Sequence, residues 1–191
     1  MTPAAPSRSA SVKMFRVARP AGRRWIAAKT GVQIVGVWGF ALAGLPALAV
    51  RADRRLGLPR WQGRARRPTG SVLLAAGSAC GLASAWTMVD RGRGTPIPFD
   101  AARDLVVAGP YRVLRNPMVV GAISQSTGIA ILLGSPIAAT IPIAGVVLWN
   151  RLLRPPEEEF LTERFGESYR RYQAAVRCWI PTWPPYRDDE I

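Results

Sequence analysis

Residues 117–153 read PMVVGAISQSTGIAILLGSPIAATIPIAGVVLWNRLL, an apolar run of 37 residues. The run is too long for one helix crossing a hydrocarbon core about 30 Å thick, and it is long enough for two such helices. It therefore predicts two membrane spans, 117–134 and 136–153, joined as a helical hairpin by a tight turn. Each predicted span starts with a capping residue directly before a proline, which is typical of helix starts. These pairs are Asn116-Pro117 and Ser135-Pro136.

Two further apolar runs lie upstream, GVQIVGVWGFALAGLPALAV at 31–50 and GSVLLAAGSACGLASAWTMV at 70–89. Each is long enough to cross a bilayer once as a helix, so four spans are expected in all. The second run is rich in small residues, which favours close packing against another helix. The first run has an alternative interpretation, because Arg23-Arg24 before it and the ALA sequence at 47–49 resemble a twin-arginine signal with its cleavage site. We prefer a retained helix.

The composition narrows the function classes. The chain combines 49% hydrophobic residues with 26 basic and 12 acidic residues, a net charge of +14. The basic residues gather between the apolar runs, as they do in membrane proteins, so we expect no nucleic-acid partner. The sequence has no histidine, and its two cysteines do not form a C-x-x-C pair. The usual general base and the commonest zinc ligand are therefore missing, and we predict no metal site.

The remaining segments suggest one membrane domain at 31–191 after a basic flexible tail at 1–30. The loop at 90–116 has glycine or proline every few residues and is expected to lie at the membrane surface. Arginines are frequent in this loop and after the last span, which places both on the cytoplasmic side by the positive-inside rule. The seven arginines at 51–69 would then lie outside, against the same rule, unless the first apolar run does not cross fully.

The polar segment at 155–186 predicts a cytoplasmic amphipathic helix followed by an aromatic tail. Pro155-Pro156 is expected to end the last span and to start this helix. One apolar stripe follows the helix at spacings of three and four residues, with charges opposite. The tail aromatics Trp179, Trp183 and Tyr186 are typical of an anchor at the bilayer surface. The stripe consists of Leu161, Phe165, Tyr169, Tyr172 and Val176.

Two short motifs flank the predicted hairpin. Residues 109–118 read GPYRVLRNPM, and Glu157-Glu158 follows the last span, ahead of FGE at 165–167 and Ile180-Pro181. In this order, on one side of the membrane and separated by two spans, the motifs resemble the isoprenylcysteine carboxyl methyltransferase and phospholipid methyltransferase superfamily. The resemblance covers 92–181. Two positions depart from the family's usual pattern, and they concern the substrate side more than the cofactor side; these are Val120 and Glu159.

The resemblance implies a site for S-adenosylmethionine built from both motifs. Arg115 suits the methionine carboxylate, because a guanidinium matches a carboxylate with two hydrogen bonds. A glutamate suits the amino group or the ribose hydroxyls, and Tyr111 suits the adenine. Without the resemblance, Asn116 would be read as a helix cap and the glutamates as partners of the helix dipole. The predicted cofactor-binding residues are Gly109, Tyr111, Arg112, Arg115, Asn116, Pro117, Glu157 and Glu158, and no residue is assigned a catalytic role.

Together these patterns predict an all-α bundle of about four transmembrane helices in a bacterial inner membrane, with the cofactor site facing the cytoplasm. The expected activity is S-adenosylmethionine-dependent methyl transfer to a lipophilic acceptor that enters from the membrane lipids. The resemblance implies a carboxylate of the isoprenylcysteine type as the preferred acceptor, and such an acceptor needs no general base. The alternatives are a phospholipid or amine N-methyltransferase, and a non-enzymatic structural or transport protein.

Overall fold

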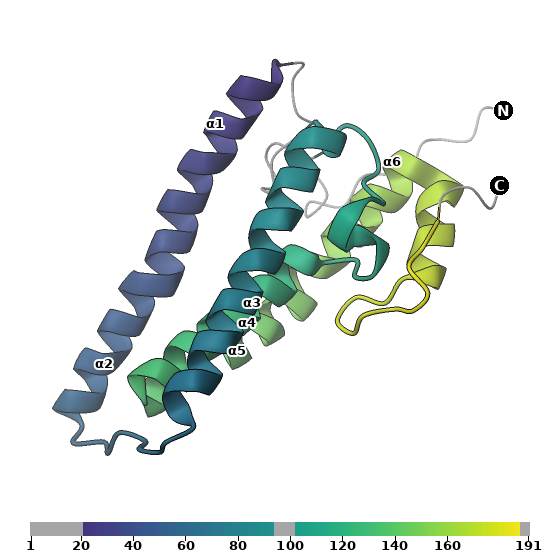
Figure 1. Cartoon of the computed structure of the whole chain (residues 1–191). Coiled ribbons are helices and arrows are strands. Elements are labelled where there is room, and N and C mark those ends of the chain that lie inside the picture. Colours follow the sequence, from purple (N-terminus) through teal and green to yellow (C-terminus); the bar gives the residue numbers. More distant parts are fainter. Residues whose placement is uncertain (1–20, 94–101, 188–191) are drawn as a thin grey trace, which may run out of the picture.

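The computed structural model describes residues 21–93 and 102–187, so most of the predicted tail and part of the 90–116 loop lie outside the described residues. Within these two ranges every regular element is a helix (Figure 1). Three helical stretches are long and apolar enough to cross a membrane, Arg23–Arg55, Arg66–Gly92 and Pro136–Ala175, and a shorter apolar helix covers Pro117–Leu133. The prediction of an all-α fold is therefore confirmed; about four spans were predicted, and three to four of the described helices could cross a membrane.

The first helical stretch consists of α1 (Arg23–Gln33), the π-helical turns η2 (Ile34–Trp38) and η3 (Phe40–Gly44), and α2 (Leu45–Arg55). It begins earlier than predicted, at Arg23, because its first turn is held by contacts across the bundle. One Arg23 guanidinium nitrogen lies 2.9 Å from an Asp90 carboxylate oxygen, and the guanidinium carbon lies 4.8 Å from the centre of the Trp86 ring. This ion pair and cation–π contact fix α1 near the end of the next helix.

The second helical stretch, α3 (Arg66–Thr87) with the π turn η4 (Met88–Gly92), packs closely on α4 (Pro117–Leu133). A Cβ atom on Gly77 would lie 2.6 Å from the carbonyl oxygen of Gly121, so only glycine fits at this crossing. Ser124 donates to the Leu73 carbonyl at 2.8 Å, and Gln125 donates to the Ser78 hydroxyl at 2.9 Å. The prediction of close packing through small residues is confirmed, and the polar side chains of α4 link the two helices.

The hairpin between α4 and α5 (Pro136–Leu148) is also confirmed. Gly134 adopts the left-handed conformation with φ 62°, and the Ser135 hydroxyl caps α5 by accepting from the Ala138 amide at 2.9 Å. Asp53 of α2 is buried against this turn, where its carboxylate accepts from the Ser135 hydroxyl and from the Ile137 amide. The first apolar stretch is thus bound into the bundle at its end.

The loop between α2 and α3 lies at the same end as the hairpin turn. The Trp61 amide donates to the Gly134 carbonyl at 3.0 Å, and Arg66 donates to the Leu132 carbonyl at 2.8 Å. Most arginines of this loop region are exposed. The structure therefore has two arginine-rich ends, one at this turn and the other at the motif segment 109–116. Both ends cannot face the cytoplasm, so one of them departs from the positive-inside rule, as the sequence already indicated.

The region after α5 differs from the sequence prediction. Pro155-Pro156 does not end the helix, because the π turn η7 (Trp149–Leu153) joins α5 directly to α6 (Arg154–Ala175). A π turn loosens the α-helical hydrogen-bond register, which accommodates prolines that cannot donate. The break falls instead at Gly166, which is non-helical with φ 55° and ψ −127°. A single amphipathic helix is therefore not confirmed.

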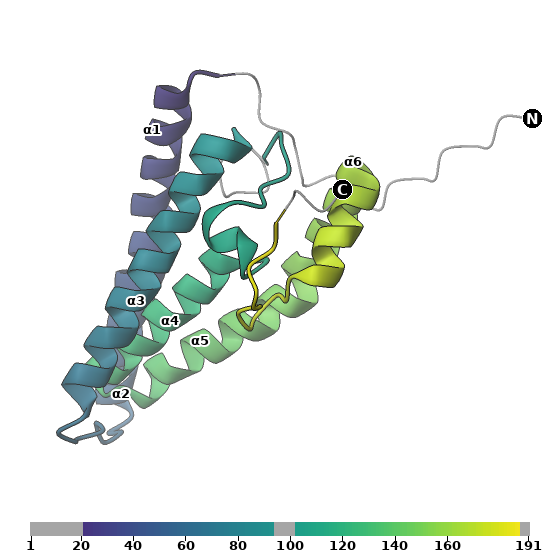
Figure 2. The ribbon, with the colours of Figure 1, turned by 45° about the vertical axis from the view of Figure 1, so that its right-hand side comes forward.

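The residues of the predicted stripe nevertheless form one cluster at the end of the bundle. Tyr169, Tyr172 and Val176 are buried there, and the tail residue Tyr186 packs edge-on against Tyr172 with ring centres 5.5 Å apart. The chain after α6 turns back along the motif segment (Figure 2), where the Arg115 amide donates to the Arg177 carbonyl at 3.0 Å. Backbone hydrogen bonds thus hold the first motif against the tail. Two further bonds of this kind join Thr182 to Val113 and Tyr186 to Arg112.

Candidate active site

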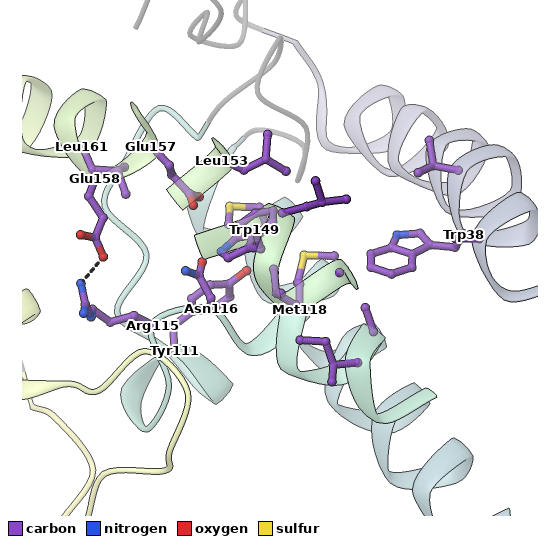
Figure 3. A pocket seen from close by; sticks show the side chains of 18 of the residues that line it. Trp38, Tyr111, Arg115, Asn116, Met118, Trp149, Leu153, Glu157, Glu158 and Leu161 are labelled. Atoms are coloured by element: carbon purple, nitrogen blue, oxygen red, sulfur yellow. Dashed lines mark hydrogen bonds and ion pairs between the residues drawn. The ribbon is translucent and has the colours of Figure 1, made fainter. Parts of the chain in front are cut away.

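A cavity of about 850 Å³ opens between the first helical stretch, α4, α5 and the start of α6. Figure 3 shows its two ends: Arg115 and Glu158 are joined by an ion pair on one side, and Trp38 lies on the other. Asn116, Met118 and Trp149 lie between them in this view. The lining is mostly apolar with a small polar group at one end, as expected of a site that binds a ligand with both characters.

The first motif reaches the cavity through a 3-10 turn, η6 (Gly109–Arg112). Gly109 starts the turn with φ 55°, and a Cβ atom there would lie 2.7 Å from the Thr87 hydroxyl oxygen, so the position requires glycine. Tyr111 is buried and lines the cavity, and burial raises the pKa of its hydroxyl. The Tyr172 hydroxyl donates to the Tyr111 carbonyl at 2.7 Å, which fixes the turn from behind.

Glu158 is fully engaged by protein partners. Its carboxylate oxygen Oε1 lies 2.7 Å from Arg115 Nη1 and 2.8 Å from Arg154 Nε, and Oε2 accepts from Gln173 at 3.1 Å. The Arg115 side chain is only 10% exposed, so this pair is shielded from solvent. Glu158 therefore acts in this structure as the group that orients Arg115.

Glu157 has the opposite environment. Its Oε2 is buried and has no hydrogen-bond partner within residues 21–93 and 102–187. The residue lies beyond the apolar part of its helix, which ends at Leu153. Burial, and then the charge of Glu158, raise the pKa of Glu157 to about 7, against the lowering influence of Arg115 and Arg154. An unpaired carboxylate at the wall of a cavity is suited to a cationic or hydrogen-bond-donating ligand.

Two donors at the cavity are also unpaired. Arg115 Nε and Trp149 Nε1 are buried and have no hydrogen-bond partner in the described part of the chain. Trp149 was not among the predicted site residues, because a tryptophan at the end of a span reads as an interfacial anchor. The π turn explains its placement: such a turn holds an extra residue, so Trp149 and Glu157, eight positions apart, come close to one helix face.

The structure brings five of the eight predicted cofactor-binding residues to the cavity wall. They are Tyr111, Arg115, Asn116, Glu157 and Glu158. The other three support this set from outside the cavity. Gly109 shapes the turn, Arg112 donates to the Tyr186 carbonyl at 2.8 Å, and the Pro117 carbonyl accepts from the Cys80 thiol. Asn116 begins α4 without a side-chain cap and instead donates to the Cys178 sulfur at 3.4 Å.

The side chains at the polar end of the cavity suit an organic ligand. The residues described in 21–93 and 102–187 contain no group of three or more Asp, Glu or Cys side chains placed to hold a metal. The wall offers one unpaired carboxylate, one guanidinium and several aromatic rings, including Tyr111, Phe165 and Tyr169. This combination suits a molecule with an ammonium, a carboxylate and a flat ring.

Comparison with known proteins decides the family. The sequence profile of the phospholipid methyltransferase family matches residues 65–168, which include both motifs and the hairpin between them. The chain belongs to this family. The predicted resemblance is thereby confirmed, and the residues that line the polar end of the cavity lie within the matched range. No solved structure matches the chain significantly.

The chain is similar over part of its length to curated proteins. It is 32% identical over 87 residues to protein-S-isoprenylcysteine O-methyltransferase A of Arabidopsis thaliana. This aligned stretch covers 44% of the present chain and 43% of the Arabidopsis protein. It is 33% identical over 82 residues to protein-S-isoprenylcysteine O-methyltransferase of Schizosaccharomyces pombe, covering 42% and 34% of the two chains. The aligned stretch thus spans less than half of either relative.

Proposed function

We propose that this protein is an S-adenosylmethionine-dependent methyltransferase of the membrane that acts on a lipophilic acceptor, with a carboxylate of the isoprenylcysteine type as the best candidate. The observation that carries the proposal is the polar end of the cavity. There the unpaired Glu157 carboxylate lines the same cavity as an Arg115 guanidinium that is oriented by Glu158, while the remaining wall is mostly apolar.

The residues at this end fit the methyl donor. Glu157 would hold its amino group, because a buried carboxylate without a partner gains most from a cationic hydrogen-bond donor. Arg115 keeps donors that Glu158 does not use, and these suit the methionine carboxylate. Tyr111 and its aromatic neighbours provide a flat apolar wall for the adenine. When bound, S-adenosylmethionine supplies an activated methyl group on a sulfonium.

The apolar part of the cavity suits the acceptor. This part is lined by Trp38 and Leu42 of the first helical stretch, Met118 of α4 and Leu148 of α5. Leu148 is also more than half exposed. A chain entering from the surrounding lipids would bury apolar surface there. The protein's task is then mainly to align the two reactants and to exclude water, since a carboxylate acceptor needs no general base.

We further propose that the site faces the cytoplasm from the inner membrane of a bacterial cell. Arginines surround the site on α6 and the tail, in agreement with the positive-inside rule. The donor is a soluble cytosolic metabolite, which also favours this orientation.

A phospholipid amine is the second candidate acceptor, and the description of the matched family favours it. An amine must lose a proton during transfer, and Glu157 is the unpaired carboxylate available for that step. The two candidates therefore assign different roles to the same glutamate.

Methyl transfer from labelled S-adenosylmethionine tests both candidates. Purified protein in detergent is given N-acetyl-S-farnesylcysteine or phosphatidylethanolamine, with boiled protein as the control. We expect label in the base-labile methyl ester of the prenylcysteine. Label in base-stable N-methyl lipid would favour the second candidate. If neither lipid acquires label, the proposed activity is contradicted.

A further inference from the structure

Trp149 has a hydrogen-bond donor that the fold leaves unused. Its indole Nε1 is buried, lines the cavity, and has no acceptor among the described residues. The nearby Trp179 shows how the chain satisfies such a donor elsewhere, because its indole donates to the Asn150 side chain at 3.1 Å. A buried N–H without a partner lowers stability, so its retention at a cavity wall indicates a ligand acceptor.

The position of Trp149 separates it from the polar end. It opens the π turn η7, eight residues before Glu157 on the same continuous helix. In Figure 3 it lies beside Asn116 and Met118, between the Arg115–Glu158 pair and Trp38. Trp149 thus occupies the junction between the polar end and the apolar part of the cavity. π turns of this kind often occur at functional sites.

We infer that the Trp149 indole N–H donates a hydrogen bond to the carboxylate of the lipophilic acceptor and selects a carboxylate over an amine. The inference rests on the proposed function and adds a specificity-determining contact to it. An indole nitrogen can only donate, and a carboxylate can only accept. A protonated amine has no acceptor to offer, and the single lone pair of a neutral amine is needed for the attack on the methyl carbon. The same N–H that binds the desired acceptor is therefore of no use to the alternative one.

The contact is compatible with the chemistry of transfer. The carboxylate oxygen supplies the electron pair of the new O–CH3 bond, the electron pair of the broken S–CH3 bond stays on the sulfur, and no proton has to be removed. A carboxylate has several lone pairs, so one can accept from Trp149 while another attacks the methyl carbon.

Indole N–H signals in an NMR spectrum of the isotope-labelled protein test the contact without any turnover. The chain has seven tryptophans, and the signal missing from Trp149→Phe identifies Trp149. We expect N-acetyl-S-farnesylcysteine to shift this signal downfield, and farnesol, which lacks the carboxylate, to leave it near its original position. Equal responses to the two lipids, or no response to the carboxylate, would overturn the inference. Trp149→Tyr provides the same assignment if the phenylalanine variant does not fold.

Steady-state kinetics give the second measurement. Trp149→Phe keeps most of the ring and loses one donor, so KM for the prenylcysteine should rise about tenfold to a hundredfold, the effect of a hydrogen bond to a charged group. Binding of S-adenosylhomocysteine should be unchanged. Trp183→Phe, at a position that is 85% exposed and outside the cavity, is the matched control. An unchanged KM in Trp149→Phe would contradict the inference.

The outcomes separate this inference from the proposed function. If the parent protein transfers methyl groups to the prenylcysteine and Trp149→Phe does so equally well, the function stands and the Trp149 contact is wrong. If the parent protein transfers nothing, the function fails, and the NMR titration still decides whether Trp149 binds a lipid carboxylate.

Discussion

Buried polar groups are hydrogen-bonded at the hairpin end of the bundle, whereas several at the cavity lack a partner among the described residues. At the hairpin turn, Asp53 and Ser135 are buried and paired with each other and with the first amides of α5. At the cavity, Glu157, Arg115 and Trp149 each leave one buried polar atom without a partner in the described residues. Because a buried unpaired group costs free energy, the first arrangement stabilises the fold and the second indicates a place for ligands.

Replacement of Asp53 is expected to have the largest effect on stability. Asp53→Ala leaves the Ser135 hydroxyl without its acceptor and the first turn of α5 with an unpaired amide, and should lower the free energy of unfolding by about 3 kcal/mol. Asp104→Ala, whose side chain is 60% exposed, is the control. Thermal unfolding in detergent measures the difference. Equal unfolding midpoints for the two variants would remove the structural role assigned to this end.

Replacement of Glu157 should change stability in the reverse direction. A carboxyl whose pKa is raised to about 7 on folding contributes its full stability below the unfolded value near 4.5 and loses it as the pH rises through 7. The free energy of unfolding of Glu157→Gln should therefore exceed that of the parent by up to about 3 kcal/mol at pH 8, and the two proteins should be about equally stable near pH 4.5. Unfolding scans at both pH values check this. A variant less stable than the parent at pH 8 would show that the carboxylate is paired.

Most helices of the bundle, and part of the candidate site, could be predicted from the sequence. Three apolar runs, one of them long enough for two spans, predicted the bundle, and Ser135-Pro136 predicted the hairpin, because length and capping act locally. The fate of Pro155-Pro156 was not predictable in this way, since a π turn depends on packing around it. The same π turn places Trp149 at the cavity wall. Because the turn departs from 3.6 residues per turn, α-helical periodicity could not predict that Trp149 and Glu157 share a helix face. Likewise, only the fold distinguishes the engaged Glu158 from the unpaired Glu157.

Membrane topology gives a further test of the comparison between the hairpin end and the site end. The cysteine substitutions that it requires should have little effect on stability. The two ends should label from opposite sides of the membrane. Ser135 is fully buried, so Arg60→Cys, at an exposed position of the adjacent loop, reports the hairpin end, and Asp104→Cys reports the site end. We expect a membrane-impermeant thiol reagent to reach Asp104→Cys only from the cytoplasmic side. Labelling of both positions from the same side would contradict the predicted crossing.

Binding of S-adenosylhomocysteine to purified Glu157→Ala and Glu163→Ala protein tests the central claim most directly. Both residues lie on α6, and only Glu157 lines the cavity. Loss of a buried charged contact should weaken binding by about 1.5–3 kcal/mol, or about tenfold to a hundredfold in Kd, while Glu163→Ala should bind like the parent. Weaker binding by a Glu157 variant that is at least as stable as the parent is the result that the account predicts. Equal binding by folded Glu157→Ala and Glu163→Ala protein would contradict it.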